Sequence, residues 1–334
     1  MHNRITFSVI MPCYNSAAYV RHAVESIRQQ SYPNWELIAV NDGSTDKTLD
    51  ILNDFAEHDK RIRVYSKENG GYCSAVNYGL EHVTGDYFLF LGSDDSLGVT
   101  LFQDIVNHII LDLPDMIGFR SVVIMDGENA GNTKETRFET IASYNGRINE
   151  FARLFPQHTD IFLVRDTSKC FRTSLLGDLR YFGKSGLDAD GIFSTLFSLK
   201  ATSFLSLPID GYYWTIRSNS LSAELTKEKN FDRLNNWIHF LTELKQYNIE
   251  IIREPAKKYY LNAHFVGLHI LKQTTTLNLK ELHLIGIARR KSYDMACRLH
   301  LEENFPLCPK NKMKKTIFLA FPDIWSFYFK NKKV

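Results

Sequence analysis

The sequence lacks the cysteine pattern of a disulfide scaffold or a structural zinc site. Its five cysteines are an odd number, they lie far apart along the chain, and no two of them form a CxxC pair. A disulfide framework normally uses an even number of cysteines, and a structural zinc site uses closely spaced cysteine pairs. The pattern therefore indicates a reducing compartment, and we expect a cytoplasmic protein.

A strong charge of one sign and a long apolar run are also missing. Forty basic residues stand against 38 acidic ones, a formal net charge of +2, which gives no sign of nucleic acid as a partner. The chain has no run of about 18 apolar residues that could span a bilayer. It also shows no basic, apolar and cleavable secretory signal. We therefore expect a folded protein that does not cross the membrane by itself.

Short apolar runs alternate with amphipathic segments through the first hundred residues. We predict strands at 7–11, 36–40, 62–65 and 87–91, and helices at 17–29, 45–58 and 71–83. The alternation predicts an α/β fold with a mostly parallel central sheet flanked by helices. Ligands of such sheets bind at the carboxyl ends of the strands. Polar, turn-forming residues follow each predicted strand, so we expect one site where four strand ends converge.

The sequence pattern predicts two regions in the later part of the chain. Between residues 119 and 155 the pattern weakens to a mix of strands and loops, and beyond residue 230 it becomes helical. We place a boundary near residues 222–230. The expected domains are a catalytic domain at 1–225, with a donor site at about 1–100 and an acceptor side at about 101–225, and a mainly helical region at 226–334.

Three acidic motifs are candidates for chemistry. Asp42 follows a buried strand and could accept a hydrogen bond from a base imide, although the same motif also suits a tight turn with a helix cap. Asp94 and Asp95 are adjacent and repel each other unless ordered donors or a cation lie beside them. Mg²⁺ or Mn²⁺ bound by one or two carboxylates and substrate phosphates would satisfy them, whereas the alternative is a turn with capping aspartates.

The third motif is Asp188-Ala189-Asp190 at the start of a predicted helix. An aspartate at this position is often a helix cap. An aspartate of this motif could instead be the general base that takes a proton from an attacking hydroxyl.

Taken together, the motifs resemble family 2 glycosyltransferases. The matching segments occur in the order of the family over residues 5–222: VIMPCYN (9–15), VNDGSTD (40–46), NGGYCSAVNYG (69–79), LGSDD (91–95), KCFRTSLL (169–176) and Asp190 to Phe193. The resemblance implies a GT-A type nucleotide-binding domain and an inverting, non-processive transferase, because the QxxRW motif and membrane-spanning helices of processive synthases are absent.

The resemblance also implies a role for particular residues. Asp190 would be the general base, with Asp188 as its rival, and Asp94 and Asp95 would bind Mn²⁺ or Mg²⁺. Arg217 resembles the basic residue of the family near the diphosphate, unless it is a plain surface arginine. The residues implied in binding the nucleotide-sugar donor are Pro12, Tyr14, Asn15, Asp42, Asn69, Gly71, Ser93, Asp94 and Arg217.

By the same resemblance, the expected substrates are a nucleotide-sugar donor, by default a UDP-sugar, and a glycan or lipid-linked acceptor of bacterial surface polysaccharide synthesis. Two departures from the family stand out, since Gly92 and Ala189 replace its usual acidic residues. Ala189 leaves Asp188 as a rival base, and Gly92 could weaken donor affinity or metal dependence. The substitution at Gly92 makes an inactive sugar-nucleotide-binding scaffold an alternative. A sugar nucleotidyltransferase is a weaker one, because Pro12 to Ser16 is not a glycine-rich basic loop.

The C-terminal part leaves its own alternatives open. The helices beyond residue 230 suit either acceptor binding or homo-oligomerisation. The segment 310–334 is rich in lysine and aromatic residues. It suits a peripheral contact with anionic lipids at the inner face of the cell membrane, or a terminal element packed on the helices.

Overall fold

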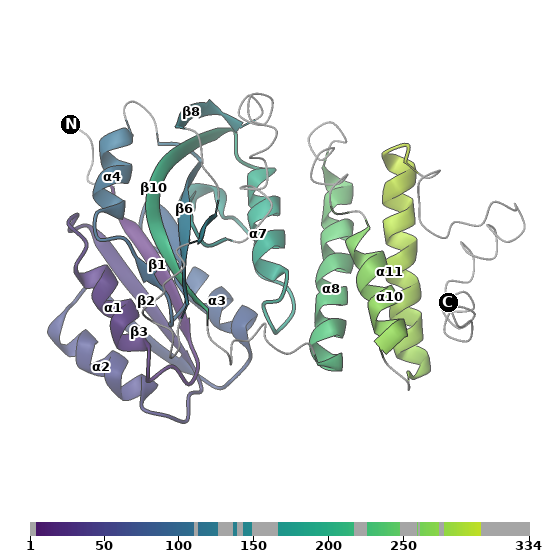
Figure 1. Cartoon of the computed structure of the whole chain (residues 1–334), viewed down its shortest axis with the longest axis horizontal. Helices are drawn as coiled ribbons and strands as arrows, with labels where there is room; N and C mark the ends of the chain where they lie inside the picture. The colour runs from purple at the N-terminus through teal and green to yellow at the C-terminus, as the bar shows by residue number, and fades with distance from the viewer. Residues whose placement is uncertain are drawn as a thin grey trace, which may run out of the picture. The chain divides into compact units, whose positions relative to one another are not determined.

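The computed structural model describes residues 5–109, 113–125, 136–138, 143–148, 166–216, 226–247, 259, 261–273 and 277–301 (Figure 1). The chain forms two compact units. The sheet unit comprises residues 1–186 and 193–223, and the helical unit comprises 187–192 and 224–334. Arg217 and the segment 310–334 lie outside the described residues. The functional division at residue 225 stays a prediction.

Four parallel strands form the first part of the sheet unit. They are β1 (Phe7–Cys13), β2 (Trp35–Asp42), β3 (Ile62–Lys67) and β4 (Tyr87–Phe90), in the spatial order β3-β2-β1-β4. The intervening helices are α1 (Val20–Arg28), α2 (Thr48–His58) and α3 (Tyr72–Leu80). The predicted α/β class is confirmed.

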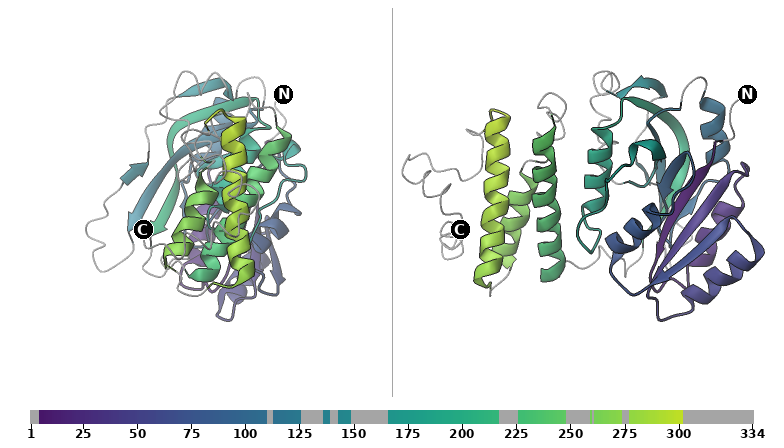
Figure 2. Two further views of the ribbon diagram at one scale, coloured as in Figure 1. Left: turned by 90° about the vertical axis from the view of Figure 1, so that its right-hand side faces the viewer. Right: turned by 180° about the vertical axis from the view of Figure 1, so that it is seen from behind.

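Alternation of side chains along the strands gives this sheet two apolar faces. Phe7, Val9 and Met11 of β1 belong to one core cluster together with residues of α1, α2 and the later helix α4 (Leu101–His108). Ile10 packs against α3 on the other face. The views from opposite sides show α3 across the sheet from α1 and α2 (Figure 1 and Figure 2). A Cβ on Gly79 of α3 would lie 2.5 Å from Ile10 Cγ2, so glycine permits this close approach.

The rest of the sheet is mixed in direction. Its elements are β5 (Ser96–Leu97), β6 (Met116–Met125), β7 (Thr136–Phe138), β8 (Tyr144–Arg147), β9 (Lys169–Arg172), a 3₁₀ turn (Thr173–Leu175), α7 (Ala189–Ser198) and β10 (Ser203–Ile216). The spatial order continues from β4 as β9-β6-β10-β5, and β9 is antiparallel to both of its neighbours. Parallel pairing therefore joins the four N-terminal strands and also β6 to β10, whereas the pairs made by β5, β7, β8 and β9 are antiparallel.

Aromatic side chains form the core between α7 and the sheet. Phe193 and Phe197 of α7 contact Phe171 of β9, with ring centroids 5.6 and 4.9 Å apart. Phe88 and Phe90 of β4 contact Phe193 from the same face of the sheet. Edge-to-face contacts of this kind add to the burial of apolar area. They fix the part of α7 that belongs to the sheet unit.

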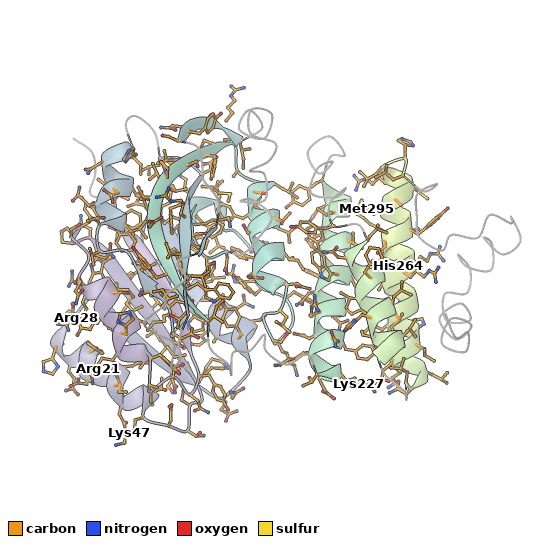
Figure 3. All side chains as sticks on the ribbon, viewed as in Figure 1. Arg21, Arg28, Lys47, Lys227, His264 and Met295 are labelled. Atoms are coloured by element: carbon orange, nitrogen blue, oxygen red, sulfur yellow. The ribbon has the colours of Figure 1, made fainter. Side chains whose placement is uncertain are left out.

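The helical unit is built from α8 (Lys227–Glu243), a 3₁₀ turn (Leu244–Gln246), α10 (Asn262–Gln273) and α11 (Leu279–Arg298). Leu234, Ile270 and Ile285 contribute to its buried core, as do His264 of α10 and Met295 of α11, which Figure 3 labels. Within the described part of the chain, no helix is long and apolar enough to span a membrane. Acceptor binding and homo-oligomerisation stay predictions for this unit.

Asp115 joins three strands of the mixed part of the sheet. Its Oδ2 accepts hydrogen bonds from the amide and hydroxyl of Thr202 at 2.8 Å each and from the amide of Ser203 at 3.2 Å. Its Oδ1 lies 3.4 Å from Arg172 Nη1. Burial alone would raise the pKa of Asp115, but the donors of Thr202 and Ser203 outweigh it and lower the pKa below its ordinary value.

We expect Asp115→Asn to lower the free energy of unfolding by about 1–3 kcal/mol at neutral pH, because an amide cannot accept all of these bonds. A carboxyl group with a lowered folded-state pKa stabilises the protein above its unfolded-state pKa. The difference from wild type should therefore shrink as the pH falls below about 4. Urea denaturation at several pH values measures it, with Asp54→Asn on the exposed surface of α2 as the control. A constant difference down to acid pH would contradict the assignment.

Candidate nucleotide-sugar site

The carboxyl ends of β1 and β4 meet at the point where the strand order reverses. Such a switch point is where open α/β sheets bind ligands. The loop after β1 contains Ser16 and the loop after β4 contains Ser93, and their Oγ atoms are hydrogen-bonded at 2.6 Å. Both serines are buried. The two loops are therefore joined directly beside the switch point.

The loop after β1 is also bound to the turn after β2. The amide of Asn15 donates to Ser44 Oγ at 3.0 Å, and Asn15 Oδ1 accepts from the amide of Thr45 at 2.8 Å. Asn15 has a φ of 48°, a left-handed conformation that asparagine tolerates better than most residues. The amide of Ser16 donates to Thr48 Oγ1 at 2.8 Å. These reciprocal bonds hold Tyr14 and Asn15 beside the second strand end.

Asp42 connects the ends of β2 and β3. Its Oδ1 accepts from Lys67 Nζ at 2.7 Å and from the amide of Gly70 at 3.0 Å, and its Oδ2 accepts from the amide of Gly71 at 2.8 Å. The residue is 3% exposed, so its charge depends on these donors. The carboxylate is thus held in one orientation at the base of the site.

Glycines allow the second and third loops to approach each other. Gly43 has a φ of 69°, and a Cβ there would lie 2.8 Å from the amide nitrogen of Asn69. Gly71 has a φ of 87°, and a Cβ there would lie 2.7 Å from the carbonyl oxygen of Lys184. Any other residue would be strained at both positions. Asn69 itself is exposed on the loop after β3.

Asp95 binds the loop after β4 to β10. Its Oδ2 accepts a short hydrogen bond from the hydroxyl of Tyr212, and its Oδ1 accepts from the amide of Thr215 at 2.8 Å. Burial raises the pKa of Tyr212, and the charge of Asp95 raises it further, so the tyrosine stays protonated and able to donate. Ordered donors thus satisfy Asp95, and this is one of the two solutions that the sequence allowed for the acidic pair.

Gly92 belongs to the same network. Its amide donates to Tyr212 Oη at 3.1 Å, and its carbonyl accepts from the amide of Asp95 at 3.1 Å. A Cβ on Gly92 would lie 2.5 Å from Asp95 Oδ2 and 2.9 Å from Asp94 Oδ1. A side chain at this position would therefore require the carboxylate groups of Asp94 and Asp95 to shift. The aspartate that the family usually has here would meet these two carboxylates first.

Asp94, with Asp95 behind it, could hold a divalent cation that also binds substrate phosphates. Oxygens of Asp94 and Asp95 converge on the space beside Gly92, and Asp94 is half-buried. No cluster of three metal-binding side chains occurs among the described residues, but magnesium sites of this kind use one or two carboxylates. Burial raises the pKa of the Cys13 thiol, and the charge of Asp94 adds to the effect, so a neutral thiol lies beside the carboxylates.

The predicted site residues fall into three groups. The first group lies at the connected strand ends described above and comprises Asn15, Asp42, Asn69, Gly71, Ser93, Asp94 and Asp95. Tyr14 is 51% exposed beside them, and Pro12 is buried inside β1. Asp188 and Asp190 belong to the helical unit. Arg217 lies outside the described residues.

The sequence interpretation missed Lys67, Tyr212 and Thr215. Each donates to a carboxylate of the site, as described above for Asp42 and Asp95. Lys67 is the last residue of β3 and lies just beyond the predicted strand 62–65, where polar residues were expected at the site, so proximity could have suggested it. Tyr212 has no such local signal, because it lies in the middle of a long strand.

Comparison with known proteins identifies the family. A model of the family described as "Glycosyl transferase family 2" matches residues 8–180, which is more than half of the chain. The chain belongs to glycosyltransferase family 2. Membership agrees with the geometry, since the matched residues include all four strand ends of the site. The resemblance inferred from the sequence motifs is confirmed.

Two curated relatives of this family 2 chain match it over most of its length. Glycosyltransferase GlyA of Streptococcus pneumoniae is 27% identical over 87% of the chain and 41% of its own length. Minor teichoic acid biosynthesis protein GgaB of Bacillus subtilis is 30% identical over 80% of the chain and 29% of its own length. The chain therefore spans less than half the length of these relatives.

Solved structures share the GT-A fold of this family 2 chain. Residues 1–349 of TarS from S. aureus, in complex with UDP-GlcNAc, match with a TM-score of 0.68 and 20% identity, over 99% of this chain and 93% of that one. A mannosyltransferase from Pyrobaculum calidifontis, in complex with GDP-Man and Mn²⁺, matches with a TM-score of 0.51 and 14% identity, over 99% and 89%. At these identities the likeness establishes the fold.

We expect Tyr212→Phe to lower the free energy of unfolding by about 1–3 kcal/mol, because it leaves the buried Asp95 without one of its donors. Tyr213→Phe is the matched control, since Tyr213 is half-buried on the neighbouring position of β10. Urea denaturation of the two variants and the wild type measures the difference. Equal losses in the two variants would show that the Tyr212 hydroxyl does not support Asp95.

Proposed function

We propose that this family 2 chain transfers a sugar from a UDP-sugar to a hydroxyl group of a glycan or lipid-linked acceptor in bacterial surface polysaccharide synthesis. One observation carries the proposal: hydrogen bonds join four strand-end loops around Asp42, Asp94 and Asp95 at the switch point of the sheet. The teichoic acid role in the name of GgaB and the UDP-GlcNAc complex of TarS support the acceptor and donor classes.

The residues of the strand ends have separate tasks in this proposal. Asp42 accepts the imide N–H of the uracil base, while Lys67 and the amides of Gly70 and Gly71 hold its carboxylate in place. Tyr14 and Asn69 border the uridine, because both are exposed at the strand ends. Asp94, with Asp95 behind it, would hold Mn²⁺ or Mg²⁺, which neutralises negative charge on the departing diphosphate when bound.

Asp190 is the general base of the proposed reaction. Its carboxylate takes the proton of the acceptor hydroxyl, whose oxygen forms a bond to the anomeric carbon of the sugar. The bond from that carbon to the diphosphate oxygen breaks at the same time, and UDP leaves with the electron pair. Attack from the face opposite the leaving group inverts the anomeric centre in a single displacement.

A screen of UDP-GlcNAc, UDP-GalNAc, UDP-Glc and UDP-Gal for UDP release tests the function, with polyol phosphate and glycan acceptors and with Mn²⁺, Mg²⁺ or chelator. We expect one donor to support release that chelator abolishes. UDP binding without release from any of these donors would favour the inactive scaffold, for which the glycine at position 92 is the motivating observation.

We expect Asp190→Asn to reduce the transfer rate at least about 100-fold, because general-base catalysis contributes factors of this size. UDP affinity should stay unchanged, since the base does not contact the nucleotide in the proposed arrangement. The control is Asp178→Asn, an exposed aspartate of the preceding loop. Transfer rates and UDP dissociation constants of both variants decide the point, and retained transfer in Asp190→Asn would assign the base elsewhere.

A further inference from the structure

One face of α8 binds the residues that precede α7. Arg233, Asn236 and Trp237 are spaced three and four residues apart, which places them on the same side of the helix. Arg233 Nε donates to Asp188 Oδ2 at 2.9 Å, Trp237 Nε1 donates to the same oxygen at 2.7 Å, and Asn236 Nδ2 donates to the carbonyl of Leu187 at 3.0 Å. These three residues are called the α8 anchor.

Two members of the α8 anchor are buried within the helical unit. Trp237 is 6% exposed and Asn236 is fully buried. The ring of Trp237 contacts Phe240 edge-to-face at 5.5 Å between centroids and lies 5.3 Å from the ring of Tyr259. An indole fixed on both sides presents its N–H in one direction. The position of Asp188 is therefore set by α8.

The backbone of Asp188 needs such support. Its φ is 64°, in the left-handed region that is unfavourable for residues with a side chain. Conformations of this kind persist where the surrounding contacts determine them, and they cluster at functional sites. The ion pair with Arg233 and the bond from Trp237 supply those contacts.

The constraint on Asp188 extends to Asp190. The carbonyl of Asp188 accepts the amide of Ile192 at 3.1 Å, which forms the first turn of α7. Asp190 lies in that turn, and its Oδ1 accepts from the amide of Gly191 at 2.8 Å. Because the turn begins at Asp188, the direction of the Asp190 side chain depends on how Asp188 is held.

We infer that Asp188 is a positioning residue, and that the α8 anchor uses it to orient Asp190 for proton abstraction. The inference rests on the proposed function, in which Asp190 is the base. It gives the helical unit a role in catalysis, because α8 holds the segment 187–192 that carries the base. It also gives the two aspartates different roles, since both carboxylate oxygens of Asp188 accept hydrogen bonds from α8.

Hydrogen exchange of the full-length protein tests the anchor without any substrate. Trp237→Phe removes the indole N–H and keeps an aromatic ring. We expect amides of residues 187–192 to exchange about 5-fold to 30-fold faster, the factor that loss of one or two kcal/mol of local stability produces. Trp35→Phe is the matched control, because Trp35 is equally buried and its Nε1 has no hydrogen-bond partner in the described structure. Unchanged exchange at 187–192 in Trp237→Phe would overturn the inference.

Kinetics then distinguish positioning from a merely structural role. We expect Trp237→Phe and Arg233→Gln to lower kcat for transfer between about 10-fold and 100-fold, since small misplacements of a catalytic group have effects of this size. The KM for the UDP-sugar and the UDP affinity should stay at wild-type values. In an Asp190→Asn background neither substitution should lower the remaining rate further, because the group that they orient is gone.

The outcomes separate this inference from the proposed function. If Asp190→Asn abolishes transfer while Trp237→Phe keeps the wild-type kcat, the inference fails and the proposed base stands. If Asp190→Asn retains transfer, the proposed base and the inference fall together. A fall in kcat that is equally large with and without Asp190 would also overturn the inference, because the anchor would then act on another group.

Discussion

A buried carboxylate must be matched by donors or a cation, and this constraint organises the site in the sheet unit. Removing a charged group from water without such partners is too costly for a folded chain to sustain. Asp42 is matched by Lys67 and two glycine amides, and Asp95 by Tyr212 and Thr215. Each match connects the end of one strand to a different segment of the chain, so the loops of the site are held by the same bonds that satisfy their charges.

The acidic pair after β4, Asp94 and Asp95, shows how two neighbouring carboxylates can have different roles under this constraint. Asp95 is 5% exposed and bound to β10, whereas Asp94 is half-buried at the strand end. Gly92 leaves the space in which their oxygens converge. The pair thus combines one carboxylate that fixes the loop with one that is suited to a cation and its phosphate ligands. The departure from the family at residue 92 is accommodated by the packing of this loop.

The sequence predicted those features of the fold that local patterns encode. Alternating apolar runs placed the strands at Phe7, Trp35, Ile62 and Tyr87 within two residues, and turn-forming residues marked their carboxyl ends. The antiparallel partners of β9 were beyond prediction, because hydrogen bonding between strands distant in the chain leaves no periodic signal. For the same reason the sequence did not predict the hydrogen bond between Asp95 and Tyr212, which lies 117 residues further along the chain.

The rival aspartates at the start of α7, Asp188 and Asp190, show the same limit. The sequence left both as candidates for the base, and the structure gives Asp188 two partners on α8, a helix that begins 39 residues later. The choice of Asp190 as base is a proposal that this pairing supports. In this proposal the helical unit takes part in the chemistry, whereas the sequence offered acceptor binding or homo-oligomerisation for it.

The central claim is that the strand ends form a nucleotide site completed by a divalent cation. Titration calorimetry of UDP into the wild type and Asp94→Asn, each with Mn²⁺ and with chelator, tests it most directly. The account predicts that Mn²⁺ tightens UDP binding at least about 10-fold in the wild type, a difference of about 1.4 kcal/mol, and has little effect in Asp94→Asn. Equal Mn²⁺ dependence in the two proteins, or no UDP binding by the wild type, would contradict it.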